Sequence, residues 1–301
     1  IYESEIINII DRIESKEEMW KAILEISFLY ENNLEKTYRR STGIYYTNVE
    51  LAKYLIDEMV EFYSGNSEDF TSKTILEPCV GIGNFIYAYF KKLFELGYSK
   101  TQINKVLQNI YVADIDYRAL ELYKIIFKKF ILIYFGIELE ESYFDGRIGS
   151  TLVFNIECGS EYIPIENVFP EIMQKGGFDI IITNPPYKNL KVEKNKYLKD
   201  EEIEKMKGTY KEFSKIVKQK FKYSNEGVLN LYKVFIEEII CNYSKDNAKI
   251  LLLIPSTILT DKTCEKIRTM ILENHSIKSI NLIPEKNKYL DAQQSLCTLL
   301  I

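Results

Sequence analysis

Short apolar segments alternate with longer amphipathic segments along most of this chain, and this alternation restricts its fold more than any other feature. The apolar segments read as strands, whereas the segments between them repeat their apolar residues at helical spacing. The expected strands are Thr74–Glu77, Asn109–Ala113, Leu152–Ile156, Phe178–Thr183, Lys249–Ile254, Ile277–Ile283 and Leu296–Ile301. Strands that alternate with helices form a mostly parallel sheet covered on both faces. We therefore expect an α/β fold around a mostly parallel, seven-stranded sheet.

The first part of the chain differs from this pattern. Residues 1–40 carry apolar side chains at helical spacing, such as Ile6, Ile9 and Ile13, and no strand signal. A break follows, and then a second amphipathic helix that Asn48 is placed to cap. We expect an N-terminal helical region over 1–40 and a larger α/β domain over 41–301.

Composition excludes several classes of protein. No apolar run approaches the roughly 20 residues of a membrane helix, and the start lacks a secretory signal. The single histidine, His275, and cysteines without a C-x-x-C pair cannot assemble an ordinary zinc set. The cysteines, expected to be small buried residues in a reducing cytoplasm, are Cys79, Cys158, Cys241, Cys264 and Cys297. Because the chain begins without methionine and ends on a strand, we expect a piece of a longer polypeptide.

Charge is distributed unevenly. The formal net charge of −5 argues against a uniformly positive surface, which is the usual footprint of nucleic-acid binding. However, the segment from Lys188 to Lys222 holds 12 lysines and 6 acidic residues, a local charge of +6, so the remainder carries −11. The ordinary interpretation of such a run is a solvated, lysine-rich helix.

A glycine turn follows the first expected strand. The sequence after Glu77 is Pro-Cys-Val-Gly-Ile-Gly-Asn-Phe, with glycines at 81 and 83, and a helix to about residue 96 comes next. Such a turn lets the backbone approach a ligand, although Gly-x-Gly alone is weak evidence. Asp114 ends the next strand, where a carboxylate can accept both ribose hydroxyls of an adenosine-type ligand. Its alternative role is to cap the following helix, which Asp116 could do equally well.

The segment Asn184-Pro185-Pro186-Tyr187 follows the fourth expected strand. Two prolines fix φ and offer no backbone donor, so the strand must stop in a rigid loop that exposes the Asn side chain and a Pro carbonyl as acceptors. A row of acceptors suits an amino group. A simple strand-ending turn would explain the prolines but neither the Asn before them nor the aromatic residue after them.

Taken in order, these segments resemble the N6-adenine DNA methyltransferases of the Asn-Pro-Pro-Tyr type whose target-recognition domain follows the catalytic domain, as in type II and IIG restriction-modification enzymes. The resemblance covers roughly residues 40–301, and the later segments at Leu231-Tyr232 and Ile254-Pro255-Ser256 also look like motifs of this family. It implies a Rossmann-like domain that binds S-adenosylmethionine. The implied cofactor residues are Thr42, Gly43, Tyr46, Thr47, Glu77, Pro78, Gly81, Gly83, Phe85, Asp114, Ile115 and Asn184. Ser160 stands where the family often has an acidic residue after the third strand.

The resemblance also assigns the chemistry to Asn184, Pro185, Pro186 and Tyr187. If the Asn184 oxygen and the Pro185 carbonyl accept the two N–H bonds of adenine N6, that nitrogen can attack the methyl group directly, with no covalent enzyme intermediate. The target base must be flipped out of the duplex, and Tyr187 and Tyr289 are expected to stack on it. A lysine-rich loop over 188–222 is expected to contact DNA phosphates. Its first lysines are Lys188, Lys191, Lys194 and Lys196.

The sequence therefore predicts site-specific adenine N6 methylation of double-stranded DNA in a restriction-modification or related phage-defence system, with a nuclease or specificity module in the same polypeptide or as a subunit. Other acceptors for the same motif are a glutamine side chain of translation release factors and adenine in RNA. The lysine-rich segment and the later motifs favour DNA over the protein acceptor. A non-enzymatic DNA-binding subunit would not need an intact Asn-Pro-Pro-Tyr motif, and in a dehydrogenase that motif would have no purpose.

Overall fold

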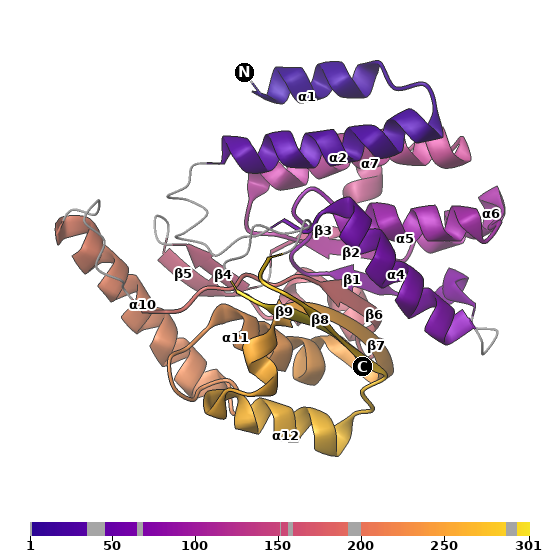
Figure 1. Cartoon of the computed structure of the whole chain (residues 1–301). Coiled ribbons are helices and arrows are strands. Elements are labelled where there is room, and N and C mark those ends of the chain that lie inside the picture. The colour runs from indigo at the N-terminus through magenta and orange to yellow at the C-terminus, as the bar shows by residue number, and fades with distance from the viewer. Residues whose placement is uncertain are drawn as a thin grey trace.

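A seven-stranded sheet forms the centre of the protein (Figure 1), seen in a computed structural model that describes residues 2–34, 46–64, 69–150, 152–155, 159–191, 200–286 and 294–301. The strand order is β3-β2-β1-β6-β7-β9-β8. β9 runs antiparallel to β7 and β8, and the other neighbouring pairs are parallel, which confirms the expected mostly parallel α/β sheet. The strands are β1 (Ile75–Glu77), β2 (Ile110–Ala113), β3 (Ile148–Gly149), β6 (Phe178–Thr183), β7 (Ser244–Pro255), β8 (Ser279–Ile283) and β9 (Leu296–Leu300).

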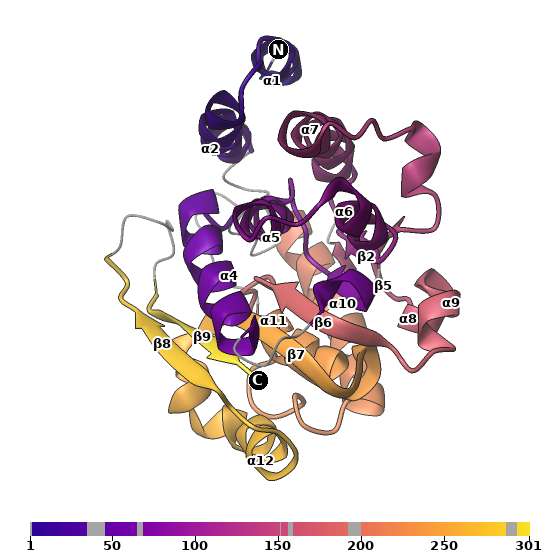
Figure 2. The same ribbon diagram turned by 90° about the vertical axis from the view of Figure 1, so that its right-hand side faces the viewer.

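Helices cover both faces of the sheet (Figure 2). One layer contains α4, α5 and α7, and the opposite layer contains α11 and α12. The helices are α1 (Tyr2–Asp11), α2 (Lys16–Asn33), α4 (Val49–Ser64), α5 (Asn84–Glu95), α6 (Lys100–Leu107), α7 (Tyr117–Phe135), α8 (Ile165–Val168), α9 (Pro170–Met173), α10 (Asp200–Lys220), α11 (Leu231–Glu238) and α12 (Glu265–Asn274). Short helical turns occur at Phe70–Ser72, Glu141–Phe144, Ile239–Tyr243, Ser256–Leu259 and Lys262–Cys264. Within the described ranges, none of these helices has the length and apolar character needed to cross a bilayer.

Local sequence signals set where several helices begin. The expected helical region over 1–40 is confirmed for α1 and α2, and Ser15 and Glu18 form a capping box at the start of α2. Asn48 accepts a hydrogen bond of 2.8 Å from the backbone N–H of Glu50, as expected of a cap. Asp116 caps α7 by accepting the backbone N–H of Arg118 at 3.0 Å.

The prediction for the third strand of the sheet was wrong. The apolar run that begins at Leu152 forms β4 (Leu152–Asn155), which pairs with β5 (Gly159–Tyr162) in a separate antiparallel hairpin. The strand beside β2 is the two-residue β3. The backbone N–H of Asp114, just after β2, donates to the Gly149 carbonyl of β3 at 3.1 Å. This pairing depends on backbone groups in a stretch without a marked apolar pattern, so periodicity did not reveal it.

The expectation of a loop over 188–222 was also wrong for most of that segment. Residues Asp200–Lys220 form the helix α10, which projects from the body of the protein in Figure 1. Its second half is anchored by the buried side chains Phe213 and Val217. Beyond its end, Glu237 accepts backbone N–H groups of residues 222–224, the shortest at 2.6 Å. The ordinary interpretation, a lysine-rich helix, holds for this part.

The expectation of buried cysteines holds only in part. Cys264 and Cys297 are buried, and Cys79 is half-buried. Cys241 is exposed on the turn after α11, so for it the expectation was wrong. Cys158 lies outside the described residues.

An aromatic cluster packs between α5 and α7 and contacts the turn at Gly83. The ring centroids of Tyr87 and Phe130 are 5.4 Å apart, and those of Tyr123 and Phe127 are 5.3 Å apart. Gly83 has a φ of +102°, and a Cβ atom there would lie only 2.6 Å from the Tyr123 ring. The position therefore excludes any side chain for a reason of packing as well as of backbone conformation.

We expect Gly83→Ala to lower the free energy of unfolding by about 1–3 kcal/mol more than Gly97→Ala does, because only the first substitution overpacks the core. Gly97 is the matched control, since its φ is also positive, at +76°, but no atom lies within 4 Å of a Cβ placed there. Urea denaturation of both variants measures the difference. Equal losses of stability would show that the cluster does not close over Gly83.

Candidate active site

The order of the strands creates a topological switch point between β1 and β6, which makes this edge of the sheet the candidate ligand-binding edge. From β1 the chain moves outward to β2 and β3, and it returns to add β6 on the other side of β1. In open parallel sheets, ligands bind at the carboxyl ends of the strands at such a switch point. Glu77 ends β1, Asp114 follows β2 and Asn184 follows β6. The structure thus brings three of the predicted site residues to one edge.

Asp114 holds the glycine turn in place. Its Oδ2 accepts the backbone N–H of Gly81 at 2.7 Å, and its Oδ1 accepts the backbone N–H of Asp116 at 2.8 Å. Burial raises the pKa of Asp114 to about 6, against the opposing effect of these two backbone hydrogen bonds. Because Asp116 caps α7, Asp114 is not needed as a cap. Its carboxylate retains lone pairs that further donors can use.

Two buried oxygens at this edge accept no hydrogen bond from the described part of the chain. They are Oε2 of Glu77, a residue that is 2% exposed, and Oγ1 of Thr183. Burial, and then the nearby Asp114, raise the pKa of Glu77 well above its usual range. A buried acceptor without a donor is costly. These residues therefore fit a ligand that brings its own N–H or O–H donors, as the ammonium and ribose hydroxyls of S-adenosylmethionine would.

Tyr46 lies against the glycine turn. A Cβ atom at Gly81, where φ is +53°, would lie 2.5 Å from Cε1 of the Tyr46 ring. The ring also meets Tyr30 edge-on, with the centroids 5.4 Å apart at 84°. Burial, and then the neighbouring Tyr30, raise the pKa of Tyr46 well above its usual range. The residue expected at the methionine end of the cofactor thus touches the turn expected to bind it.

Asn184 is held in a defined orientation. Its Nδ2 donates to Thr47 Oγ1 at 2.9 Å, which joins two predicted cofactor segments that lie 137 residues apart. The Tyr187 hydroxyl lies within hydrogen-bonding distance of Asn184 Oδ1 and of the Leu253 carbonyl, the latter at 2.9 Å, so its single proton serves one acceptor at a time. Tyr187 is 8% exposed, and Pro185 is buried. The corner is therefore fixed by neighbours as well as by its prolines.

The remaining predicted residues have different positions. Phe85 is a core residue on α5, and Pro78 and Ile115 lie in the turns after β1 and β2. Lys188 is half-buried and Lys191 is exposed. Thr42, Gly43, Lys194, Lys196 and Tyr289 lie outside the described residues, as does the side chain of Ser160.

Sequence reasoning missed Ser150, the residue that follows β3. Its hydroxyl donates to the backbone carbonyl of Asp114. The cofactor role of Ser160 was predicted from a position after the third strand. In the structure, Ser160 lies in β5, opposite Phe154. The strand position on which that assignment rested therefore belongs to Ser150, and the role of Ser160 stays a prediction.

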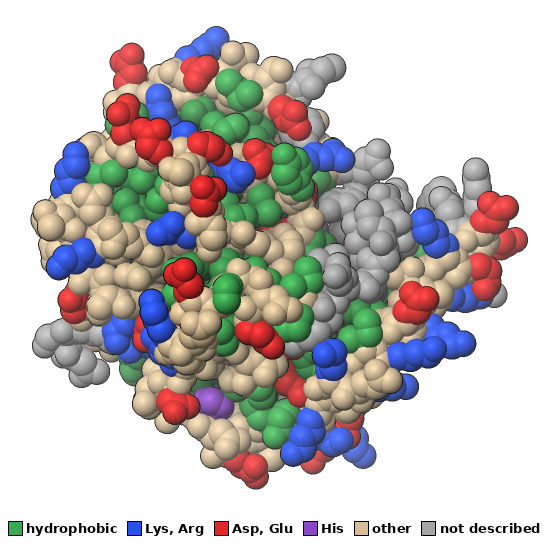
Figure 3. Space-filling view, turned by 180° about the vertical axis from the view of Figure 1, so that it is seen from behind, with side chains coloured by type: hydrophobic (Ala, Val, Ile, Leu, Met, Phe, Trp, Pro, Cys, Tyr) green, Lys and Arg blue, Asp and Glu red, His purple; other side chains and the backbone are tan. Residues whose placement is uncertain are grey.

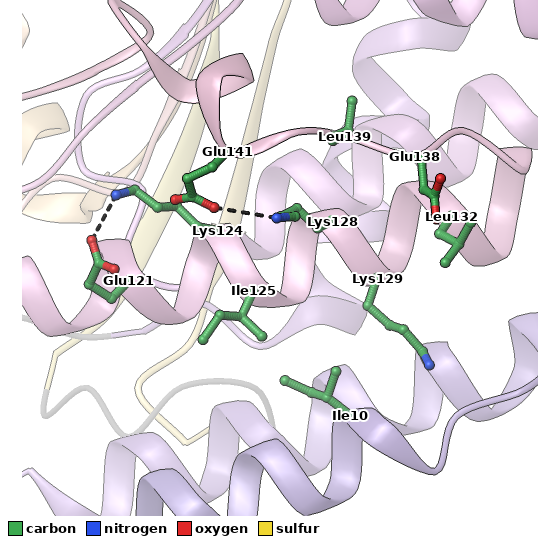
Figure 4. A pocket seen from close by; sticks show the side chains of 10 residues that line it. All are labelled: Ile10, Glu121, Lys124, Ile125, Lys128, Lys129, Leu132, Glu138, Leu139 and Glu141. Carbon is green, nitrogen blue, oxygen red and sulfur yellow. Dashed lines mark hydrogen bonds and ion pairs between the residues drawn. The ribbon is translucent and has the colours of Figure 1, made fainter.

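A groove of about 440 Å³ lies elsewhere, between α7, α1 and the segment that follows α7 (Figure 4). Ile10 of α1 and Ile125 of α7 contribute apolar walls. Four of its charged side chains form two ion pairs, Lys124 with Glu121 at 2.7 Å and Lys128 with Glu141 at 3.3 Å. It contains none of the predicted site residues.

Comparison with known proteins identifies the family of the chain and agrees with the fold. The family described as Eco57I restriction-modification methylase matches residues 108–288, which is more than half of the chain. Type II methyltransferase M.VspI from Vibrio sp. (strain 343) is 28% identical over 162 residues. That alignment covers 54% of this chain but only 29% of the relative. The chain thus spans less than a third of the length of this curated relative.

Solved structures share the fold at low sequence identity. DrdV, solved in complex with DNA, superposes with a TM-score of 0.66 at 12% identity, covering 96% of this chain and 29% of DrdV. The ATP-dependent type ISP restriction-modification enzyme LlaBIII, bound to DNA, gives 0.62 at 18% identity, covering 96% of this chain and 20% of that enzyme. A putative class I S-adenosylmethionine-dependent methyltransferase from Listeria monocytogenes gives 0.52 at 14% identity, covering 97% and 69%. With its match over residues 108–288, the chain belongs to the Eco57I restriction-modification methylase family.

Proposed function

We propose that this chain transfers a methyl group from S-adenosylmethionine to N6 of an adenine that has been flipped out of double-stranded DNA at a specific site. The observation that carries the proposal is the Asn184 amide, oriented by Thr47 at the same sheet edge as Asp114 and the glycine turn. Membership of a restriction-modification methylase family supports DNA as the acceptor. Because the chain spans 29% of M.VspI, substrate choice by the whole protein is part of the proposal.

The cofactor residues are assigned by the donors and acceptors that they offer. When bound, S-adenosylmethionine supplies a methyl group on a positively charged sulfur. Asp114 accepts the ribose hydroxyls, and Glu77 accepts from the ammonium group, because its buried oxygen has no donor in the described chain. Gly81 lets the backbone come close. Thr42, Gly43, Tyr46, Thr47 and Ile115 complete the predicted cofactor contacts.

Asn184 and Pro185 orient the nucleophile. The Asn184 Oδ1 and the Pro185 carbonyl accept the two N6 hydrogens and direct the lone pair of that nitrogen towards the methyl group. Thr47 Oγ1 accepts from Nδ2 and the Tyr187 hydroxyl lies beside Oδ1, so the side-chain amide is held between two partners. The protein therefore contributes orientation and electrostatic matching rather than a covalent intermediate.

DNA binding is assigned to the surface beside this corner. Tyr187 and Tyr289 stack on the flipped base, and because Tyr187 is 8% exposed, its covering groups must separate as the base enters. Lys188, Lys191, Lys194 and Lys196 contact phosphates, and α10 extends the basic surface. Figure 3 shows lysine side chains along this projecting helix, at the right of the view, with acidic side chains towards its tip.

Methyl transfer by the full-length protein tests the proposal. With radiolabelled S-adenosylmethionine and DNA, RNA or a release factor as acceptor, we expect label in N6-methyladenine of DNA. Asn184→Ala should lower kcat by at least about 100-fold, because one of two oriented acceptors for the reacting amine is lost. Nucleoside analysis of digested DNA identifies the methylated atom.

Asn242→Ala is the matched control, since Asn242 is exposed and, within the described part of the chain, its side chain donates to Glu238 alone, at 3.1 Å. It should retain the wild-type rate. Label found only in protein or RNA would overturn the choice of acceptor. Full activity of Asn184→Ala would overturn the proposed role of the motif.

The affinity for S-adenosylmethionine should depend on the ionisation of Asp114. Hydroxyl donors favour the carboxylate, so binding lowers a pKa that stands at about 6 in the free protein. The contribution of Asp114 to affinity should therefore rise with pH up to about 6 and level off above it, and its loss should increase the Kd by up to about tenfold between pH 7 and pH 5. Calorimetric titration measures this change.

Asp114→Asn provides the comparison for the pH experiment. It removes the titrating group while keeping one acceptor oxygen, so its Kd should be higher at pH 7 and nearly constant from pH 5 to pH 7. A wild-type Kd that does not change over this range would contradict the assigned ribose contact.

A further inference from the structure

Helix α2 of the N-terminal region contacts the candidate active site through two side chains. Ser27 and Tyr30 are three residues apart and therefore lie on the same face of the helix. Both are buried, at 8% and 1% exposed. Each begins a different series of hydrogen bonds, and the two series end at different parts of the site.

The series from Tyr30 ends at the glycine turn. Tyr30 Oη donates to Asp116 Oδ2 at 2.6 Å. The backbone N–H of Asp116 donates to Asp114, and Asp114 accepts the N–H of Gly81. The Tyr30 ring also packs edge-on against Tyr46, which lies over Gly81. Tyr30 thus supports Asp114, the proposed ribose-binding carboxylate, through its hydroxyl, and it supports Tyr46, which lies over the glycine turn, through its ring.

The series from Ser27 ends at the catalytic motif. Ser27 Oγ lies 3.1 Å from both side-chain amide atoms of Asn84, the first residue of α5. Asn84 Nδ2 donates to the backbone carbonyl of Thr47 at 2.7 Å, and Thr47 Oγ1 accepts from Asn184. Ser27 thus supports the residue that orients the Asn184 amide.

We propose that α2 is a structural part of the methyltransferase site, in which Tyr30 is a positioning residue for cofactor binding and Ser27 is a positioning residue for the methyl-transfer step. This inference rests on the proposed function. Neither side chain is assigned a contact with the cofactor or the base. Each acts by fixing a group that does, and a small misplacement of such a group is costly to binding or rate.

Two conservative substitutions in the full-length protein separate these roles. Tyr30→Phe removes one hydroxyl and should raise the Kd for S-adenosylmethionine by about three- to tenfold, because a hydrogen bond to a buried carboxylate is lost. Ser27→Ala should lower kcat by about three- to tenfold while the Kd for S-adenosylmethionine changes by less than about twofold. Calorimetry gives the Kd without DNA, and single-turnover methylation gives the rate.

Tyr134→Phe is the matched control. Tyr134 on α7 also ties α2 to the body, through a hydrogen bond of 3.1 Å from its hydroxyl to the Lys16 carbonyl, but it contacts neither series. It should change neither the Kd nor the rate. Asp116→Asn supplies a second measurement of the Tyr30 contact, because it can keep the cap oxygen of α7 while replacing the oxygen that Tyr30 binds. It should raise the Kd as Tyr30→Phe does.

The outcomes distinguish this inference from the proposed function. If the wild type binds and transfers normally while Tyr30→Phe matches Tyr134→Phe in Kd, the cofactor role of Tyr30 is refuted and the proposed function stands. An unchanged rate for Ser27→Ala refutes the second role in the same way. If the wild-type protein binds no S-adenosylmethionine, the proposed function fails and this inference fails with it.

Discussion

The Asp114 carboxylate lies where two turns of the backbone meet, and the shape of the candidate ligand-binding edge depends on the hydrogen bonds that this carboxylate accepts. Removing a carboxylate from water is costly unless hydrogen bonds replace the lost hydration. Two backbone N–H groups do so here, one from Gly81 after β1 and one from Asp116 before α7. The same bonds tie the glycine turn to the start of the neighbouring helix. A left-handed φ at Gly81 accompanies this arrangement, and the absence of a side chain there leaves room for the Tyr46 ring.

Much of the fold could be predicted from the sequence, because most strands are apolar runs that are bounded by turn residues and alternate with amphipathic helices. The strands β1, β2, β6, β7, β8 and β9 all lie within or overlap the expected segments. β3 did not emerge because it consists of two residues, Ile148 and Gly149, that pair through backbone groups. The third strand of the sheet was predicted instead at the more apolar run that begins at Leu152, but that run pairs with β5 in a local hairpin. Helix α6 was missed for a related reason, since its signal is a capping box at Ser99 and Gln102 over only eight residues.

The candidate site divides in the same way between local motifs and distant contacts. The glycine turn, Asp114 and the Asn184 corner could be identified because each is a contiguous motif with its own chemistry. The contacts that fix them could not, since Thr47 and Asn184 are 137 residues apart and Tyr30 and Asp116 are 86 apart. Ser27 and Tyr30 lie within an ordinary amphipathic helix, and no sequence pattern marks a buried hydroxyl that serves a distant carboxylate or amide. Only the packing of α2 against the domain reveals them.

The Asn184 corner shows how one amide can be both satisfied in the free chain and available to a substrate. Its Nδ2 is engaged by Thr47, so its Oδ1 has a fixed direction. That oxygen lies within reach of the Tyr187 hydroxyl, which can give its proton to the Leu253 carbonyl instead. A carbonyl oxygen has two lone pairs, so an incoming N–H donor can bind Oδ1 without leaving the hydroxyl unsatisfied. Replacing one partner by another avoids the penalty of an unpaired buried group. In the proposed reaction, the loop can therefore stay stiff, as its prolines require, while the Tyr187 hydroxyl donates to the Leu253 carbonyl and the amine of the base donates to Oδ1.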